Sequence, residues 1–161
     1  MMTDPLRRCG ARWWLRPLVA VAALTAVVLG VGYGVEFERS VSPRKLPLAA
    51  QEFLAEHYPQ QTPALVLWAW DDFRIRYEVF FHTGTQLRFR YAGALKAVDS
   101  RQQPIPAGIV PEAVREYVGR HFPGTVITKL EHERREWEVR LSNGVELSFD
   151  DRDFFPTGYD D

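Results

Sequence analysis

Cysteine is nearly absent from this chain of 161 residues: Cys9, close to the N-terminus, is the only one. The remainder of the chain therefore has no disulfide and no thiol chemistry. Charge of one sign is not in excess either, because 20 lysines and arginines stand against 21 aspartates and glutamates, for a net charge of -1. Binding to nucleic acid requires a clustered basic face. This balance gives no sign of one, so nucleic acid is not an expected partner.

Motifs of the common catalytic and cofactor sites are missing as well. The sequence has no Gly-Lys-Ser/Thr phosphate loop, no G-x-S-x-G elbow and no dinucleotide fingerprint. Residues His132 to Glu136, HERRE, begin like the zinc-binding HExxH motif but end in Glu. The segment is also predicted to be strand and turn, where two ligands cannot stack one helical turn apart. We therefore predict no catalytic residue, no metal and no cofactor, and we do not expect an enzyme.

Two other groups of metal-ligating residues have plainer explanations. His57 and His121 each fall in the last turn of a predicted helix, where a histidine interacts favourably with the helix dipole and caps carbonyl groups. The acidic C-terminal region, with Asp150, Asp151 and Asp153, has two interpretations, a weak calcium site or a solvated terminus. The second is favoured, since chain ends are commonly solvated.

Residues 17–35 form a run of nineteen positions without a charge. A helix of this length spans about 28 Å, close to the thickness of a bilayer's hydrocarbon core. Four arginines precede the run and two glutamates follow it closely, a bias that keeps the N-terminus in the cytoplasm. We expect residues 1–35 to be a transmembrane anchor or a cleaved signal peptide. Residues 36–45 are predicted to be a linker, and the rest is predicted to lie on the periplasmic side.

The remaining part of the chain repeats one pattern. Residues 78–90 read EVFFHTGTQLRFR, and residues 138–150 read EVRLSNGVELSFD. Upstream, Leu46-Pro47 and His57-Tyr58-Pro59 are matched 64 positions later by Val110-Pro111 and His121-Phe122-Pro123. Matches at so many spaced positions indicate an internal repeat.

Each copy predicts one short helix followed by an antiparallel meander. The prolines suit the first helical turn and later stop the helix. Alternating apolar residues predict strands with one buried face, and the turns HTG and SNG end in a glycine typical of three-residue hairpin loops. The predicted cross-strand pairs are Val79 with Leu87, Tyr77 with Phe89, Val139 with Leu147 and Trp137 with Phe149 on the buried face, and Glu78 with Arg88 and Arg140 with Glu146 on the other. Further strands are expected at 64–70, 94–99 and 126–132, with a poorer one near Phe154.

These motifs resemble the PepSY-like, beta-lactamase-inhibitor-like family of exported bacterial proteins, over Leu46 to about Tyr159. The resemblance implies an α+β fold in which a tandem repeat packs its helices on one face of a curved antiparallel sheet. We therefore expect two helix-plus-meander units, at 46–100 and 105–161, behind one N-terminal membrane helix. The family's inhibitors carry an acidic residue on a hairpin tip. The matching tips here, residues 82–84 and 142–144, carry none, so inhibition of a beta-lactamase is not expected.

One group of residues departs from the alternation of apolar and polar positions. Phe80 is predicted to point to the polar side of its sheet, among arginines, and an aromatic amid arginines is typical of interfaces. Packing between the two units is an equal explanation for this apolar surplus. The predicted protein-binding residues are Phe80, Arg74, Arg76, Arg88 and Arg90.

The function expected from these observations is a non-catalytic extracytoplasmic module that restrains or senses another envelope protein, in line with the peptidase restraint that the PepSY name suggests. The partner is thus an unknown envelope protein, with the membrane contacted through the N-terminal helix. Two alternatives remain. One is a membrane-tethered structural domain that associates with itself. The other is an enzyme of unrecognised type, which would need a polar cleft with perturbed titratable groups.

Overall fold

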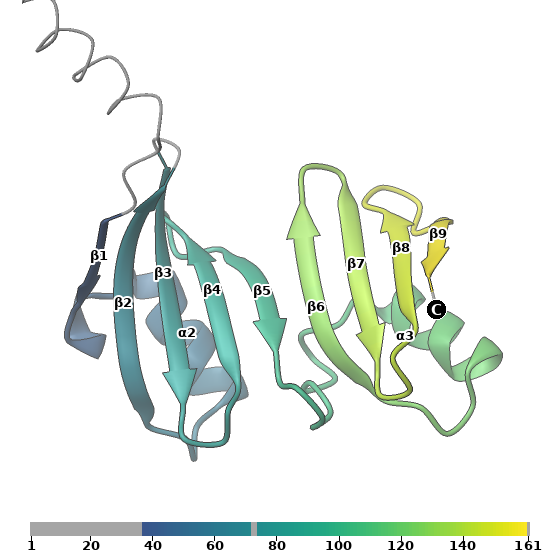
Figure 1. Ribbon diagram of the computed structural model, residues 1–161, viewed down its shortest axis with the longest axis horizontal. Coiled ribbons are helices and arrows are strands. Elements are labelled where there is room, and N and C mark those ends of the chain that lie inside the picture. Colours follow the sequence, from purple (N-terminus) through teal and green to yellow (C-terminus); the bar gives the residue numbers. More distant parts are fainter. Residues whose placement is uncertain (1–36, 72–73, 161) are drawn as a thin grey trace, which may run out of the picture. The chain divides into compact units, whose positions relative to one another are not determined.

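The computed structural model describes residues 37–71 and 74–160 (Figure 1). The chain divides into two units, Met1–Val35 and Glu36–Asp161. The predicted anchor or signal peptide lies in the first unit, outside the described residues. Within the described part, no helix is both long enough and apolar enough to cross a membrane.

The second unit begins with a short strand and then places two α-helices among eight further strands. The elements of its first part are β1 (Phe37–Ser40), η1 (Pro43–Lys45), α2 (Leu48–His57), β2 (Pro63–Asp71), β3 (Arg74–Phe81), β4 (Gln86–Arg90) and β5 (Leu95–Asp99). Those that follow are α3 (Glu112–His121), β6 (Ile127–Glu133), β7 (Glu136–Leu141), β8 (Glu146–Asp150) and β9 (Pro156–Asp160). Pro47 and Pro111 stand immediately before the two helices, and His57 and His121 end them.

The predicted fold class is wrong. We expected two helix-plus-meander units, with helices packed on a curved sheet. The structure is mostly one antiparallel sheet of nine strands, in the order β1 to β9, with two α-helices in the part of the chain described. A meander leaves unpaired N–H and C=O groups along its last strand. β6 supplies partners for those of β5, with Val98 opposite Leu130, and β1 adds a strand before α2.

The hairpin register is confirmed within that sheet. Tyr77 lies opposite Phe89, and Val79 lies opposite Leu87. In the later hairpin, Trp137 pairs with Phe149 and Val139 with Leu147. The polar pairs Glu78–Arg88 and Arg140–Glu146 are also in place. The alternation of the sequence therefore predicted correctly which side chains share a face.

One hydrophobic core lies between the helices and the sheet. Both helices lie behind the sheet in the view of Figure 1. Phe53 of α2 meets the edge of Phe89 at a centroid distance of 5.6 Å, and Tyr117 of α3 meets Phe149 at 5.3 Å. Phe89 and Phe149 are fully buried. The core residues of both parts belong to a single cluster, so the opposite face of the sheet has no helix among the described elements to cover it.

Candidate functional site

The face of the sheet opposite the helices, called the open face below, is defined by residues that alternate with the core. One row of side chains crosses it from β1 to β9, because neighbouring strands place these residues opposite one another. The row is Ser40, Leu67, Glu78, Arg88, Ala97, Glu131, Glu138, Ser148 and Gly158. A second row begins with Leu65, Phe80, Gln86 and Asp99 and continues through Lys129, Arg140, Glu146 and Asp160. Most of the residues in these rows are polar or charged.

Phe80 lies on this face as the sequence predicted. It stands opposite Leu65 on β2 and Gln86 on β4. Phe80 is half-buried, whereas Leu65 is 41% exposed. The two side chains form an apolar island, defined here as Phe80 and Leu65, within an otherwise charged surface.

The four predicted arginines share the open face with Phe80, but most of them are already engaged. Arg76 contacts Glu78 at 2.9 Å and Glu38 at 3.8 Å. Arg88 contacts Glu131 at 2.7 Å, and Arg90 donates a hydrogen bond of 2.8 Å to the carbonyl of His132. Arg74, the first residue of β3, is exposed. Ion pairing therefore fixes the orientation of the guanidinium groups of Arg76 and Arg88.

Glu131 is the centre of the charged network. Its side chain is 9% exposed and lies 2.7 Å from Arg88, 3.3 Å from Lys129 and 3.7 Å from Lys96. Burial raises the pKa of the Glu131 carboxyl, but the attraction of Arg88, Lys129 and Lys96 outweighs it, so the pKa lies below its ordinary value. The carboxylate thus joins cations from three adjacent strands, β4, β5 and β6.

A small residue, alanine, makes the contact between Arg88 and Glu131 possible. Arg88 and Glu131 belong to strands that are not neighbours, since β5 lies between them, and the intervening residue in the row is the buried Ala97. Strands two places apart are separated by about 9.6 Å, a gap that an arginine side chain crosses only over a small residue. The same arrangement recurs where Arg76 reaches Glu38 across the buried Ala69.

Charge is divided unevenly along the open face. The described open-face side chains of β1 to β4 include four arginines and two glutamates, which sum to +2. Those of β6 to β9 include Lys129 and Arg140 but seven carboxylates, which sum to -5. The carboxylates are Glu131, Glu133, Glu136, Glu138, Glu146, Asp150 and Asp160. The apolar island therefore lies in the basic part.

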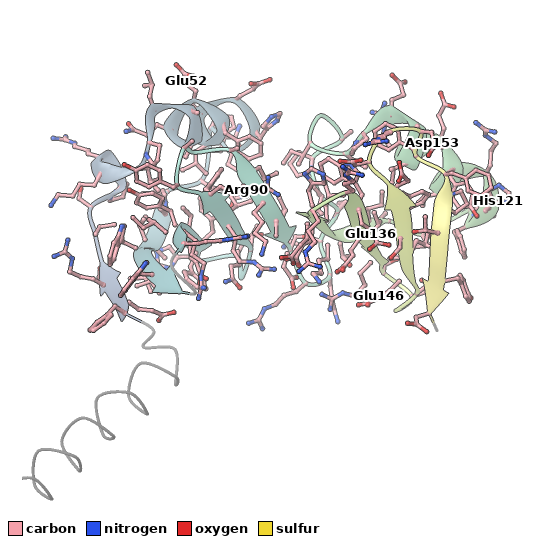
Figure 2. The ribbon with its side chains drawn as sticks, turned by 90° about the horizontal axis from the view of Figure 1, so that it is seen from above. Glu52, Arg90, His121, Glu136, Glu146 and Asp153 are labelled. Atoms are coloured by element: carbon pink, nitrogen blue, oxygen red, sulfur yellow. The ribbon has the colours of Figure 1, made fainter. Side chains whose placement is uncertain are left out.

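Two hollows lie on the acidic part of the open face. The larger, of about 660 Å³, is lined by Glu133, Arg134, Arg135, Glu136 and Asp150, among others. The smaller, of about 200 Å³, lies over Ser148 and Gly158, where Gly158 has no side chain to fill the row. Figure 2 shows Glu136 and Glu146, which line the two hollows, on the neighbouring strands β7 and β8. Sequence reasoning missed these hollows, although Gly158 in a strand was a signal for one of them.

The metal-ligating residues singled out in the sequence take part in local contacts. His57 packs on Phe53 and His121 on Tyr117, with centroid distances of 4.5 and 4.3 Å. Asp150 and Asp153 each accept a hydrogen bond from a backbone N–H two residues later. His132 lies 3.6 Å from Asp151. Across residues 37–71 and 74–160, no three His, Cys, Asp or Glu side chains converge as a metal ion would require.

Comparison with known proteins identifies similar chains. The family model described as beta-lactamase-inhibitor-like, PepSY-like matches residues 75–155. Three solved structures, all described as putative periplasmic proteins, share the fold. A DUF2874-family protein from Bacteroides vulgatus is 31% identical, with a TM-score of 0.74, over 77% of this chain and 97% of that chain. No curated protein matches.

The other two structures are similar over comparable lengths. A protein from Bacteroides thetaiotaomicron, described as calcium-regulated, is 30% identical, with a TM-score of 0.74, over 77% of this chain and 97% of that chain. A second protein from Bacteroides vulgatus, described as of unknown function, is 27% identical, with a TM-score of 0.72, over 79% of this chain and all of that chain. Both likenesses extend well beyond the residues that the family model matches.

Proposed function

This chain belongs to the PepSY-like, beta-lactamase-inhibitor-like family, and we propose that it is a non-catalytic module that binds and restrains another protein of the bacterial envelope. The periplasmic descriptions of its structural neighbours support an extracytoplasmic location. We propose further that residues 17–35 anchor the module in the membrane. A peptidase fits the name of the family as the restrained partner.

The observation that carries this proposal is the apolar island of Phe80 and Leu65 on a face that no described helix covers. An aromatic side chain gains about 1.5–3 kcal/mol when it is fully buried. The arginines beside it can stack on a partner's aromatic rings or pair with its carboxylates. Because salt bridges already hold Arg76 and Arg88, these side chains lose less conformational freedom on binding than free arginines would.

The charge of the surrounding surface supports a partner of complementary charge. The open face of β1 to β4 carries a net +2 among its described side chains. A partner that presents an apolar side chain flanked by carboxylates would complement this surface. A negative potential on the partner and a positive potential here would speed their encounter and disfavour partners of the wrong charge.

The proposal is tested by crosslinking in the native envelope. A photoreactive phenylalanine analogue at position 80 should capture a discrete partner, and the same analogue at position 126 should not. Val126 is a matched control because it is 38% exposed and lies outside the apolar island. Phe80→Ser should then reduce capture strongly, whereas Val126→Ser should leave it unchanged.

Thermal unfolding of the same variants decides between an interface and a core residue. Phe80 is half-buried, so Phe80→Ser is expected to cost about 1 kcal/mol, part of the value for full burial. If Phe80→Ser lost several times that stability while capture stayed at the level of the unchanged chain, Phe80 would be a packing residue and the proposed interface would be wrong.

The uneven charge of the open face favours one second candidate, self-association. A two-fold axis would place the basic part of one copy on the acidic part of the other, twice in the same dimer. Such a dimer would weaken steeply as salt rises. Sedimentation of the full chain in detergent at low and high salt tests this candidate, and a monomer at low salt would exclude it.

A further inference from the structure

Exposed aromatic side chains gather at one end of the nine-stranded sheet. Because its strands are antiparallel and consecutive, this end holds the start of β1, the end of β2, the start of β3 and the turns β4–β5, β6–β7 and β8–β9; it is called the leader end below. It carries Phe37, which is 55% exposed, Tyr91, 65% exposed, and Phe155, 68% exposed. Among the described residues the fourth exposed aromatic, Tyr159, lies on β9 and stacks on Phe122.

The opposite end has a different chemistry. Its two hairpin tips, residues 82–84 and 142–144, consist of histidine, threonine, serine, asparagine and glycine. The hairpin turns β3–β4 and β7–β8 at the opposite end are as short as those at the leader end, so turn length alone does not explain why the aromatic residues gather at one end. A contact surface at the leader end that uses aromatic side chains would explain their position.

Aromatic rings and arginines lie next to one another in the first strands of this end. Phe37 stacks on Trp70 at a centroid distance of 6.1 Å with an interplanar angle of 19°. The guanidinium of Arg39 lies 6.0 Å from the centre of the Trp68 ring. Arg74 is exposed at the start of β3. Aromatic residues with arginines close by are typical of the membrane–water interface, where the rings sit at headgroup level and the cations attract anionic lipids.

In the sequence, β1 follows the expected membrane segment almost immediately. The uncharged run ends at Val35, two residues before Phe37. Two extended residues cover about 7 Å, and the polar region on each side of a bilayer is about 5–8 Å thick. If the run spans the membrane, Phe37 lies within or just beyond the headgroup layer.

We propose that the leader end of the sheet rests on the membrane surface, with Phe37, Trp70 and Tyr91 in the headgroup layer and Arg39 and Arg74 facing anionic headgroups. This inference rests on the anchor included in the proposed function. It goes further, because a flexible tether alone would hold the domain near the membrane without any contact of Tyr91.

Spin labels on the full chain test the contact. Cys9→Ser removes the native thiol, and Phe37→Cys, Tyr91→Cys and Val126→Cys then each provide one labelling site. Val126 is the matched control, since it is exposed and lies near the opposite end, beside Ser142. The chains are reconstituted in vesicles of equal parts phosphatidylcholine and phosphatidylglycerol, and collisions of each label with oxygen and with a water-soluble nickel chelate are measured.

The labels at 37 and 91 should show an oxygen-to-nickel collision ratio several-fold higher than the label at 126. The label at position 91 distinguishes membrane contact from simple tethering, because the link to the expected membrane segment would by itself hold residue 37 near the bilayer. Equal ratios at 91 and 126 would overturn the proposal. In vesicles of phosphatidylcholine alone the ratio at 91 should fall, and an unchanged ratio would refute the part assigned to the arginines.

A failure of this inference is distinguishable from a failure of the proposed function. Tyr91→Ser should lower membrane contact without changing the capture of a partner at position 80. Phe80→Ser should do the reverse. Loss of capture in Tyr91→Ser, with the collision ratios of the remaining sites unchanged, would place Tyr91 in the protein interface and contradict the membrane assignment.

Discussion

Replacing Glu131 by glutamine removes the charge at the centre of the open-face network with almost no change in shape. The residue is 7% exposed, and its carboxylate lies within 4 Å of Arg88, Lys129 and Lys96. A glutamine can keep a hydrogen bond through its amide oxygen, but it leaves three cations facing one another across adjacent strands. We therefore expect Glu131→Gln to destabilise the second unit, Glu36–Asp161.

The size of the effect follows from the burial of the partners. Removing one partner of a fully buried ion pair costs about 3–5 kcal/mol. The three cations here keep 31%, 27% and 20% of their side-chain surface exposed, so solvent relieves part of the penalty. A loss of about 2–3 kcal/mol in the free energy of unfolding is expected. For a domain of this size, that corresponds to a fall in Tm of about 6–12 °C.

The pH dependence of this loss has a defined sign. The pKa of Glu131 in the folded state lies below the value of 4.5 expected without the fold. Its ionisation therefore stabilises the fold fully above that value, and the contribution is lost as the pH falls through the folded-state pKa. The difference in stability between the unchanged chain and Glu131→Gln should be greatest near neutral pH and should shrink in acid.

Urea unfolding at pH 7 and at a series of lower pH values measures both effects. Glu138→Gln is the matched control: Glu138 is opposite Glu131 on β7, its side chain is 50% exposed, and it lies 3.9 Å from Lys129. An exposed pair of this kind is worth about 0–1 kcal/mol. Equal stability losses in Glu131→Gln and Glu138→Gln would refute the role assigned to Glu131, as would a difference that does not change with pH.

Two further predictions concern the core, beside those for Phe80 and the leader end. Gly93 has a φ of +90°, and an added Cβ would lie 2.9 Å from Pro47 Cβ and 3.0 Å from the backbone N of Ala50. Because of this strain and crowding, Gly93→Ala should lower the free energy of unfolding by more than about 2 kcal/mol. Gly119→Ala is the control: it should raise the free energy of unfolding by about 0.5–1 kcal/mol, since a Cβ there meets nothing within 4 Å. Similar urea midpoints for the two variants would contradict this account. The buried hydroxyl of Tyr58 has no hydrogen-bond partner among the described residues, and burial raises its pKa to about 12. Tyr58→Phe should therefore keep or raise stability by up to about 1 kcal/mol at pH 7, and it should remove the loss of stability that the unchanged chain shows as the pH rises above 10.

Much of the local structure followed from neighbouring residues. The alternation in residues 74–81 and 136–141, with glycine-ended turns, predicted the pairs of Tyr77 with Phe89 and Trp137 with Phe149. The same pattern placed Phe80 on the open face with its arginines. These features are local because a strand's two faces are set by a period of two residues and a hairpin's register by its turn.

The salt bridges of the open face could not be predicted from residues that are neighbours in the sequence. Arg88 and Glu131 are 43 positions apart, and no spacing rule relates them. Their contact exists because β5 pairs with β6 and because the small side chain of Ala97 stands between them. The sequence predicted that Arg88 lies opposite Glu78 on the polar face, but it did not predict the ion pair of Arg88 with Glu131.

By itself, the sequence determined the family, the two hairpins and the faces on which their residues lie, all of which depend on motifs a few residues long. Only the tertiary structure decided that β1 and the β5–β6 pair complete one nine-stranded sheet, and which charges neutralise one another on its open face. The reason is physical. Side-chain alternation is carried by consecutive residues, but hydrogen bonding between strand edges and Coulomb attraction depend on which backbones lie side by side, and that is settled only when the whole chain has folded.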